Sequence, residues 1–312
     1  MNTILLKDRF KNKESGLLFY GLTPPKQNND DEKIRDIANK QIERLKGLEL
    51  DGLILYDIQD ESSRTDLTRP FPFLATLSPD DYSDNYLTQL ELPRIIYKSV
   101  GKYSLNEFKN WITEKSIKND CVVLVGAPST HHAATLSLAD AYKIAHPAIH
   151  TVALGGVTIP ERHDKKGDEH IRIFNKIDSG CSFFISQCVY SANHTKNFLS
   201  DYYYSSLEQN RELQPIIFTL TPCGSIKTLQ FMEWLGIDIP KWLNNDLKHS
   251  TDILGKSIEI CKTIAVELLE FCNEKKIPIG FNIESVAIRK EEIEASIQLV
   301  RDVRGLMEKC LI

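Results

Sequence analysis

Short apolar segments alternate with longer amphipathic segments along the whole chain. Several of the apolar segments are continuous, which is typical of strands that are covered on both faces. Strands are predicted at Leu17–Leu22, Leu53–Tyr56, Arg94–Tyr97, Val122–Val125, Thr151–Thr158, Ser182–Gln187, Pro215–Leu220 and Ile277–Phe281. Apolar positions at helical spacing predict helices at Asp31–Leu48, Asn106–Glu114, His132–Ile144, Gly167–Asp178, His194–Glu208, Ser225–Leu235, Leu254–Lys275 and Ser285–Met307.

This alternation of eight strands with helices predicts an α/β fold, a (β/α)8 TIM barrel. Residues 1–312 are predicted to form a single domain with extended C-terminal helices, because neither a composition shift nor a linker divides the chain. A doubly wound open sheet is the alternative, since periodicity does not reveal strand order. Ser104 and Glu107 predict a capping box at one helix start. In a barrel the residues that follow each strand are the candidates for function.

Charge, apolar run length and cysteine spacing argue against several classes of protein. The net charge of -5, without a long basic run, argues against nucleic acid or an anionic membrane as the main partner. No apolar stretch approaches the roughly 18–20 residues of a membrane helix, and the N-terminal apolar run is too short for a secretory signal. The seven cysteines form no C-x-x-C pair. They are expected to be reduced thiols in a cytoplasmic protein.

The segment after the second predicted strand is rich in carboxylates. Asp57, Asp60 and Glu61 lie within five residues of one another. Such groups supply acid–base chemistry or hold a polar ligand. The competing interpretation is a solvated loop with local Asp and Ser turns.

Other strand ends carry weaker signals. The adjacent His131 and His132 follow the fourth strand, but neighbouring side chains rarely reach one ion and no zinc-ligand spacing follows, so no metal site is predicted. Gly155 and Gly156 would allow a close approach by backbone or ligand. Gln187 ends an apolar run, and a buried amide there either joins a structural network or binds a ligand.

Several of these segments, taken in order, resemble the methylenetetrahydrofolate reductase family. The segments that carry the resemblance are Tyr20–Lys26, Ser63–Thr68, Gly156–His163, Asn175–Gln187 and Phe231–Trp242. The stretch from Lys176 to Gln187 is the most specific of them.

The resemblance implies a barrel that binds FAD at its mouth, takes hydride from NADH or NADPH and passes it to a reduced folate. Gln187 matches the amide that contacts folate, and Phe231 matches the aromatic residue that flanks it. Lys176 matches a basic group near the flavin phosphates, and Glu169 stands where an acidic ligand of the flavin ribose is usual.

The chain departs from the family pattern at cofactor and catalytic positions. Gly21 stands where the family has its catalytic Glu, and Val125-Gly126-Ala127 replaces Arg-Gly-Asp. Tyr97 replaces a usual His. Glycine cannot donate a proton, and general acid catalysis is worth about 10²–10⁴-fold. These departures make FAD binding doubtful and require another acid.

Candidates for that acid are Asp57, Asp60, Glu61 and Glu284, because the loops after strands two and eight flank strand one in a barrel. The first hypothesis is a flavin-dependent oxidoreductase acting on a reduced folate that carries a one-carbon group. The alternative is a divergent barrel that has lost flavin chemistry and binds a folate, a pterin or a partner enzyme of one-carbon metabolism. A third possibility is an unrelated α/β enzyme with coincidental matches. A homo-oligomer remains possible.

Overall fold

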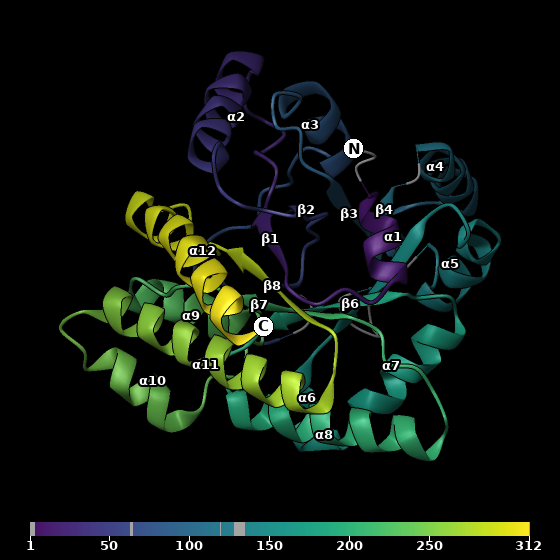
Figure 1. Ribbon diagram of the computed structural model, residues 1–312. Coiled ribbons are helices and arrows are strands. Elements are labelled where there is room, and N and C mark those ends of the chain that lie inside the picture. Colours follow the sequence, from purple (N-terminus) through teal and green to yellow (C-terminus); the bar gives the residue numbers. More distant parts are fainter. Residues whose placement is uncertain (1–3, 63–64, 119, 128–134, 312) are drawn as a thin grey trace.

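Eight parallel strands close into a barrel in the computed structural model, which describes residues 4–62, 65–118, 120–127 and 135–311 (Figure 1). The strands follow one another around the ring in chain order, and β1 pairs with β8 to close it. The strands are β1 Leu17–Leu22, β2 Gly52–Leu55, β3 Arg94–Ser99, β4 Cys121–Val125, β5 Ala153–Thr158, β6 Phe183–Cys188, β7 Ile216–Leu220 and β8 Ile279–Glu284. The predicted TIM barrel is therefore confirmed, and the open sheet is excluded.

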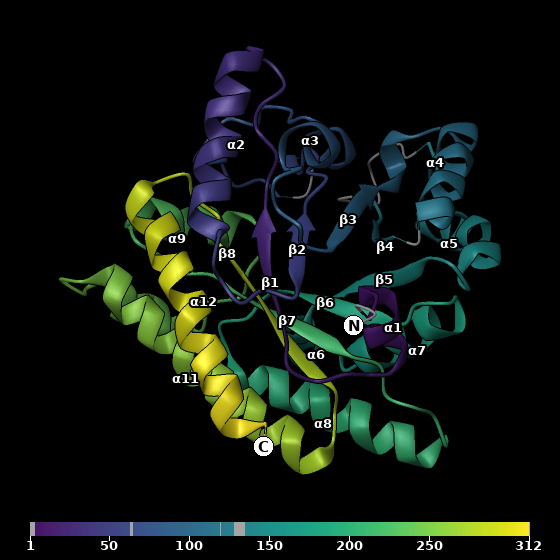
Figure 2. The ribbon, with the colours of Figure 1, turned by 45° about the horizontal axis from the view of Figure 1, so that its top comes forward.

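Helices surround this ring, with long amphipathic segments covering its outer face (Figure 2). They are α1 Leu6–Lys11, α2 Asp31–Leu45, α3 Pro79–Tyr86, α4 Leu105–Lys118, α5 Leu138–Ala145, α6 Pro160–Lys166, α7 Glu169–Asp178, α8 Ala192–Glu208, α9 Ile226–Trp234, α10 Lys241–Lys248, α11 Ile253–Lys275 and α12 Lys290–Cys310. Short helices α1, α3, α6 and α10 were absent from the sequence-based list, since six to eight residues give little periodicity. None of the helices among the described residues is long and apolar enough to cross a membrane.

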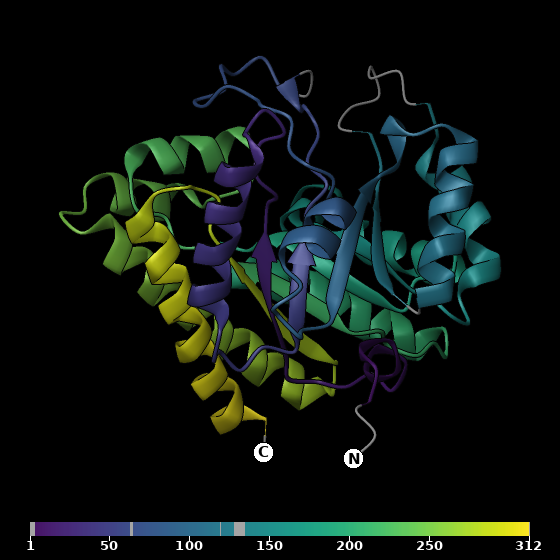
Figure 3. The same ribbon diagram turned by 90° about the horizontal axis from the view of Figure 1, so that it is seen from above.

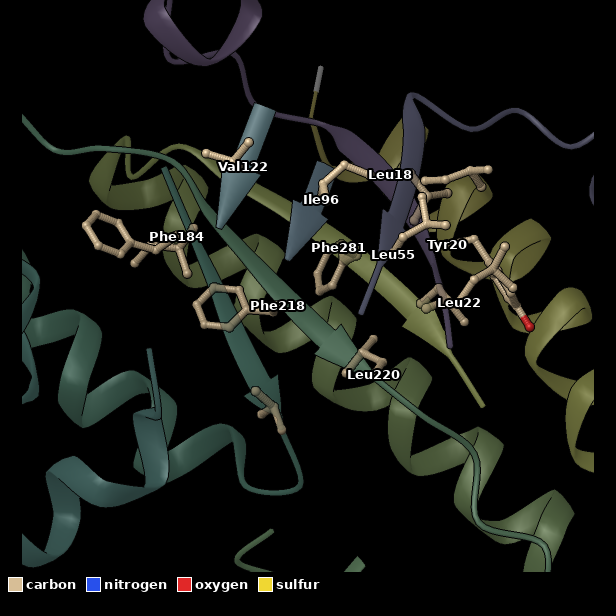
Figure 4. Close-up of a cluster of buried hydrophobic side chains, with 14 of the residues drawn as sticks. Leu18, Tyr20, Leu22, Leu55, Ile96, Val122, Phe184, Phe218, Leu220 and Phe281 are labelled. Atoms are coloured by element: carbon tan, nitrogen blue, oxygen red, sulfur yellow. The ribbon is translucent and has the colours of Figure 1, made fainter. Parts of the chain in front are cut away.

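Alternation along each strand divides the core into two layers. Outward-facing side chains such as Leu18, Leu55 and Phe281 pack beneath the helices (Figure 4). Inward-facing side chains, such as Phe19 and Ile185, form a separate cluster inside the ring. Most strands are thus apolar on both faces, which explains the continuous apolar runs in the sequence.

The N-terminal end of the barrel is closed by α1. Phe10 of α1 belongs to the inner cluster, and its ring stacks on Phe183 with centroids 4.0 Å apart. Gly155 leaves room for this stack, because a Cβ there would lie 2.5 Å from the Phe183 ring. The start of α1 and the end of α12 lie on this side, away from the strand tips (Figure 3). The opposite end of the ring, at the C-terminal ends of the strands, is where a barrel of this kind carries its functional residues.

Local signals agree with the predicted pattern. The Ser104 amide donates to Glu107 Oε2 over 2.7 Å, and the Glu107 amide donates to Ser104 Oγ over 3.3 Å, so the capping box is confirmed. All seven cysteines are free thiols, and Cys310 alone is not fully buried.

Candidate functional site

A carboxyl group lies directly beside Gly21 at the C-terminal end of the barrel, and it comes from β8. Gly21 pairs in register with Glu284, the last residue of β8. A Cβ built on Gly21 would lie 2.9 Å from Glu284 Oε2 and 2.9 Å from Cε2 of Tyr56. The missing side chain at residue 21 therefore makes the space that these two side chains fill.

Neutral polar groups surround the Glu284 carboxyl. The Cys188 thiol donates to Oε1 over 3.3 Å, and Asn282 Nδ2 lies 3.5 Å from Oε2. Asn282 Nδ2 also donates to the Tyr56 hydroxyl over 2.8 Å and to Thr219 Oγ1 over 3.2 Å. This set of side chains, Glu284, Asn282, Tyr56 and Cys188, is called the β8 cluster below.

Burial raises the pKa values of the ionisable groups in this cluster, and the described residues place no cation against the Glu284 carboxyl. Desolvation raises the pKa of Glu284, and hydrogen bonds from Tyr56, Cys188 and Asn282 only partly oppose it. The pKa of Tyr56 is raised well above its usual value by burial and then by the charge of Glu284. Tyr97, whose ring centroid lies 4.8 Å from that of Tyr56, is shifted the same way for the same reasons. Burial therefore shifts all three groups towards their protonated forms.

The three carboxylates predicted to act as catalytic acids lie elsewhere on the rim. Asp57 is buried and ion-paired, with Lys102 Nζ 2.5 Å from Oδ1 and the Ser99 amide 2.8 Å from Oδ2. Asp60 is exposed and accepts from the amide and hydroxyl of Ser62. The negative charges of Glu61 and Asp60 both act on the Arg69 guanidinium and partly oppose the lowering of its pKa. No described contact joins any of the three to the β8 cluster, so their catalytic role remains a prediction.

Gln187 and Phe231, the predicted folate-binding residues, are linked through α9. Gln187 Nε2 donates to the Leu235 carbonyl over 3.1 Å, at the end of this helix. The Phe231 ring lies on α9 and makes an edge contact with Phe71, with centroids 5.3 Å apart. Phe71 belongs to the long loop after β2. The rim loop and α9 therefore meet at the position predicted to flank the substrate.

The same loop carries an arginine that sequence reasoning missed. The Arg69 guanidinium lies over the rings of Trp234, Phe73 and Phe231, at 4.6, 5.2 and 5.6 Å from their centroids. Its Nε and Nη1 atoms are buried and find no hydrogen-bond partner within the described ranges. Desolvation lowers its pKa, and its nearest described carboxylate oxygen, on Asp60, is 4.0 Å away. Aromatic residues at 71 and 73 beside an arginine were the available signal.

The two residues predicted to bind flavin, Glu169 and Lys176, both make hydrogen bonds within the protein. Glu169 is fully buried at the start of α7, and its Oε1 accepts from Thr158 Oγ1 and the Ile159 amide over 3.0 and 2.9 Å. Its Oε2 accepts from Arg162 Nε over 2.7 Å. Lys176 donates to the Val157 carbonyl, and desolvation lowers its pKa. Glu169 thus joins α6 and α7 to β5, and Lys176 joins α7 to β5. A flavin that contacted them through its ribose and its phosphates would have to displace these bonds.

A cluster of possible metal ligands lies on the outer helices. Ligand atoms of His163, His170 and Asp201 lie within 4.8 Å of one another. The Glu169 amide donates to His163 Nδ1 over 3.3 Å, so the neutral ring carries its proton on Nε2 and donates it to Asp201 Oδ2 over 3.0 Å. A metal ion bound at Nε2 would have to displace that proton. The observed contacts therefore favour a hydrogen-bonded pair of His163 and Asp201 over a metal site. His131 and His132 lie outside the described residues.

Signals for the β8 cluster were present but obscured. Asn282 and Glu284 are two residues apart, so both face inward on a strand. The predicted last strand ended at Phe281, however, which placed Glu284 in a loop without an orientation. Three further residues of the structure extend that strand to Glu284 and give its side chain a direction.

Comparisons with known proteins agree with this geometry. A family model described as methylenetetrahydrofolate reductase matches residues 137–295. A search of curated proteins found no match. A solved structure described as an uncharacterized protein from Clostridium thermocellum, which binds two copies of 5-methyl-5,6,7,8-tetrahydrofolic acid, is 52% identical. That alignment covers 97% of this chain and 100% of the other, with a TM-score of 0.87.

A second solved structure, the catalytic core of xylanase A, shares the fold alone. It is 9% identical, covers 94% of this chain and 99% of its own, and has a TM-score of 0.51. The sequence segments, the closed barrel and the family match lead to one conclusion: the chain belongs to the methylenetetrahydrofolate reductase family.

Proposed function

We propose that this protein binds a reduced folate of the 5-methyltetrahydrofolate class at the C-terminal mouth of its barrel, without a flavin. The observation that carries the proposal is the 52% identity, over 97% of the chain, to a protein that binds 5-methyltetrahydrofolate. Family membership supports the same ligand class.

The chemistry of the mouth suits a pterin. A pterin is a flat heterocycle with donors and acceptors along its edge, so it requires an aromatic surface and amide partners. Phe231 offers the aromatic surface at the rim, and Gln187 offers an amide beside it. The β8 cluster adds a carboxyl, a phenol and a second amide, from Asn282, whose Oδ1 has no hydrogen-bond partner within the described residues.

The anionic end of a folate has a matching group in Arg69. A folate ends in glutamate carboxylates, and the guanidinium fork binds carboxylates with two parallel hydrogen bonds. Arg69 has two buried N–H groups without partners among the described residues, and it contacts the Phe231 ring. Leaving such donors unpaired costs about 1–3 kcal/mol each. A bound carboxylate would remove that cost.

The second candidate is the flavin-dependent reductase, with NADH or NADPH as the electron donor, and the family match favours it. This function requires Glu169 and Lys176 to release their present hydrogen bonds, and the chain has Val125 and Ala127 where the family has its Arg and Asp. Visible absorption separates the two candidates. We expect purified protein to be colourless and to remain so after incubation with FAD and removal of free flavin. A retained yellow chromophore would favour the reductase.

Calorimetric titration with 5-methyltetrahydrofolate tests the ligand itself. We expect saturable binding, and much weaker binding of a pterin that lacks the glutamate tail. Glu208→Gln, on the exposed end of α8, is the matched control and should bind as the wild type does. Absence of any heat or thermal-shift response to the folate, with folded protein, would contradict the proposal.

A further inference from the structure

We propose that Glu284 is the proton donor of the folate pocket: its carboxyl, lying in the space beside Gly21, transfers a proton to N5 of the bound reduced folate. This inference rests on the proposed folate-binding function. It assigns to β8 the acid that family resemblance leads one to expect on β1.

Position is the first argument. Glu284 and Gly21 are register partners at the strand ends, and the Glu284 carboxyl lies where a residue-21 side chain would begin. Glu284 and Tyr56 keep partial exposure, whereas Asn282 beneath them is fully buried. A ligand entering from the mouth would therefore meet the carboxyl and the phenol first.

Charge is the second argument. The groups that face Glu284 are Tyr56, directly after β2, Tyr97 from β3, Cys188 from β6 and Asn282 from its own strand. The charge of Glu161, from α6, also acts on the Cys188 thiol. Within the described ranges Glu284 makes no ion pair with Lys, Arg or His. A buried carboxyl without a cation holds its proton to higher pH, and burial raises the pKa of Glu284 accordingly.

The other predicted acids are less suited to this role. Asp57 is ion-paired with Lys102 and accepts a backbone amide, so both of its carboxylate oxygens already have partners. Asp60 is exposed and held by Ser62. The β8 cluster alone combines a carboxyl, a polar neutral surrounding and a place beside Gly21.

The proposed step is a simple proton transfer. The O–H bond of Glu284 breaks, its electron pair stays on the carboxylate, and the N5 lone pair forms the new N–H bond. The products are a carboxylate and an ammonium that face each other as an ion pair. No oxidant or further reactant is needed. Protonation makes N5 a better leaving group for the one-carbon unit it carries.

This step predicts how affinity depends on pH. The folate binds the protonated form of Glu284, so binding above the pKa of Glu284 requires uptake of one proton. Affinity should then fall about tenfold for each pH unit above that pKa, and should level off below it.

The first test uses wild-type protein alone. Calorimetric titrations with 5-methyltetrahydrofolate in two buffers of different ionisation enthalpy measure protons taken up on binding. We expect uptake to rise towards one proton as pH increases. Binding without uptake at any pH between about 5 and 9 would overturn the inference while leaving the proposed function intact. Absence of binding would instead contradict the proposed function.

The second test uses Glu284→Gln, which keeps the shape but has no acidic proton. We expect it to bind the folate with pH-independent affinity. The ¹³C shift of a labelled N5-methyl group should indicate a neutral amine in this variant and a protonated amine in the wild type. Glu284→Asp should restore the pH dependence, and Glu208→Gln should match the wild type. Identical pH slopes in wild type and Glu284→Gln would refute the inference.

Discussion

Two glutamates at the same end of the barrel show what a neighbouring cation does to a buried carboxyl. Glu169 receives hydrogen bonds from Arg162, Thr158 and a backbone amide, so its charge is compensated. Among the described residues, Glu284 receives hydrogen bonds from neutral groups only, and burial raises its pKa. The first side chain joins α6 and α7 to β5, and the second is the proton donor in our proposal.

Removing the Glu169 carboxylate should lower the free energy of unfolding more than any of the other changes below. Glu169→Ala leaves Arg162, Thr158 and the Ile159 amide without their acceptor, and removing one partner of a buried ion pair costs about 3–5 kcal/mol. Glu284→Gln should change the free energy of unfolding by less than about 1 kcal/mol, because no ion pair is lost. Urea denaturation of both variants measures the difference. Equal destabilisation would contradict the contrast between the two sites.

Glu161 of α6 is a third buried carboxyl to compare with these two. It is buried, its Oε2 has no hydrogen-bond partner among the described atoms, and burial raises its pKa to about 8. The folded state holds a proton that the unfolded state releases at lower pH. This contribution to stability is therefore present below the unfolded pKa and is lost as pH rises towards about 8.

Glu161→Gln should remove that loss and stabilise the protein at pH 9 by on the order of 2–4 kcal/mol. The effect should vanish near pH 4. Thermal unfolding across pH gives the measurement, with exposed Glu208→Gln as the control. Parallel pH profiles for wild type and Glu161→Gln would show that Glu161 is ionised in the folded protein.

Gly21→Ala tests the close contact in the β8 cluster. Its Cβ would lie 2.9 Å from both Glu284 and Tyr56, which should cost about 1–3 kcal/mol. Replacing Glu284 by Ala in the same chain should recover part of this cost. Gly305→Ala on α12 meets no atom within 4 Å and should be neutral or slightly stabilising. Additive costs in the Gly21→Ala and Glu284→Ala double variant would show that the two residues do not touch.

Arg69→Lys should reduce folate affinity by about tenfold, the smallest effect expected here. Lysine keeps the charge but loses the planar fork and its stacking on Trp234 and Phe231. Binding of a tail-less pterin should be unchanged, and this ligand is the internal control. A loss of affinity for both ligands alike would place the defect in the pterin pocket.

Most of the barrel could be predicted because each strand is a continuous apolar run between helical patterns. The β1 bounds were predicted without error, since Pro24 and Pro25 end that strand sharply. The end of β8 was missed, because Asn282 and Glu284 are polar and their environment comes from β1, β2 and β6. The local sequence does not indicate which side chains from other strands will contact these two residues.

The candidate site was predictable only by residue type. Gln187, Phe231 and Glu284 were identified before the structure, but their neighbours could not be. Arg69 lies over the rings of Trp234 and Phe231, which are more than 160 residues away in the chain. The hydrogen bond from Trp234 to the Leu67 carbonyl joins the same two segments across 167 residues. Glu169 matched a flavin ligand in sequence, while its burial against Arg162 became visible only once α6 and α7 were packed together.

The central claim is that a reduced folate binds beside Glu284 at the barrel mouth. Isotope-filtered NMR with ¹³C-methyl-labelled 5-methyltetrahydrofolate tests it directly, because nuclear Overhauser contacts report protons within about 5 Å. We predict contacts from the N5-methyl group to the ring protons of Tyr56 or Tyr97. A bound ligand whose methyl group contacts neither ring, but contacts residues on the outer helices instead, would contradict the account.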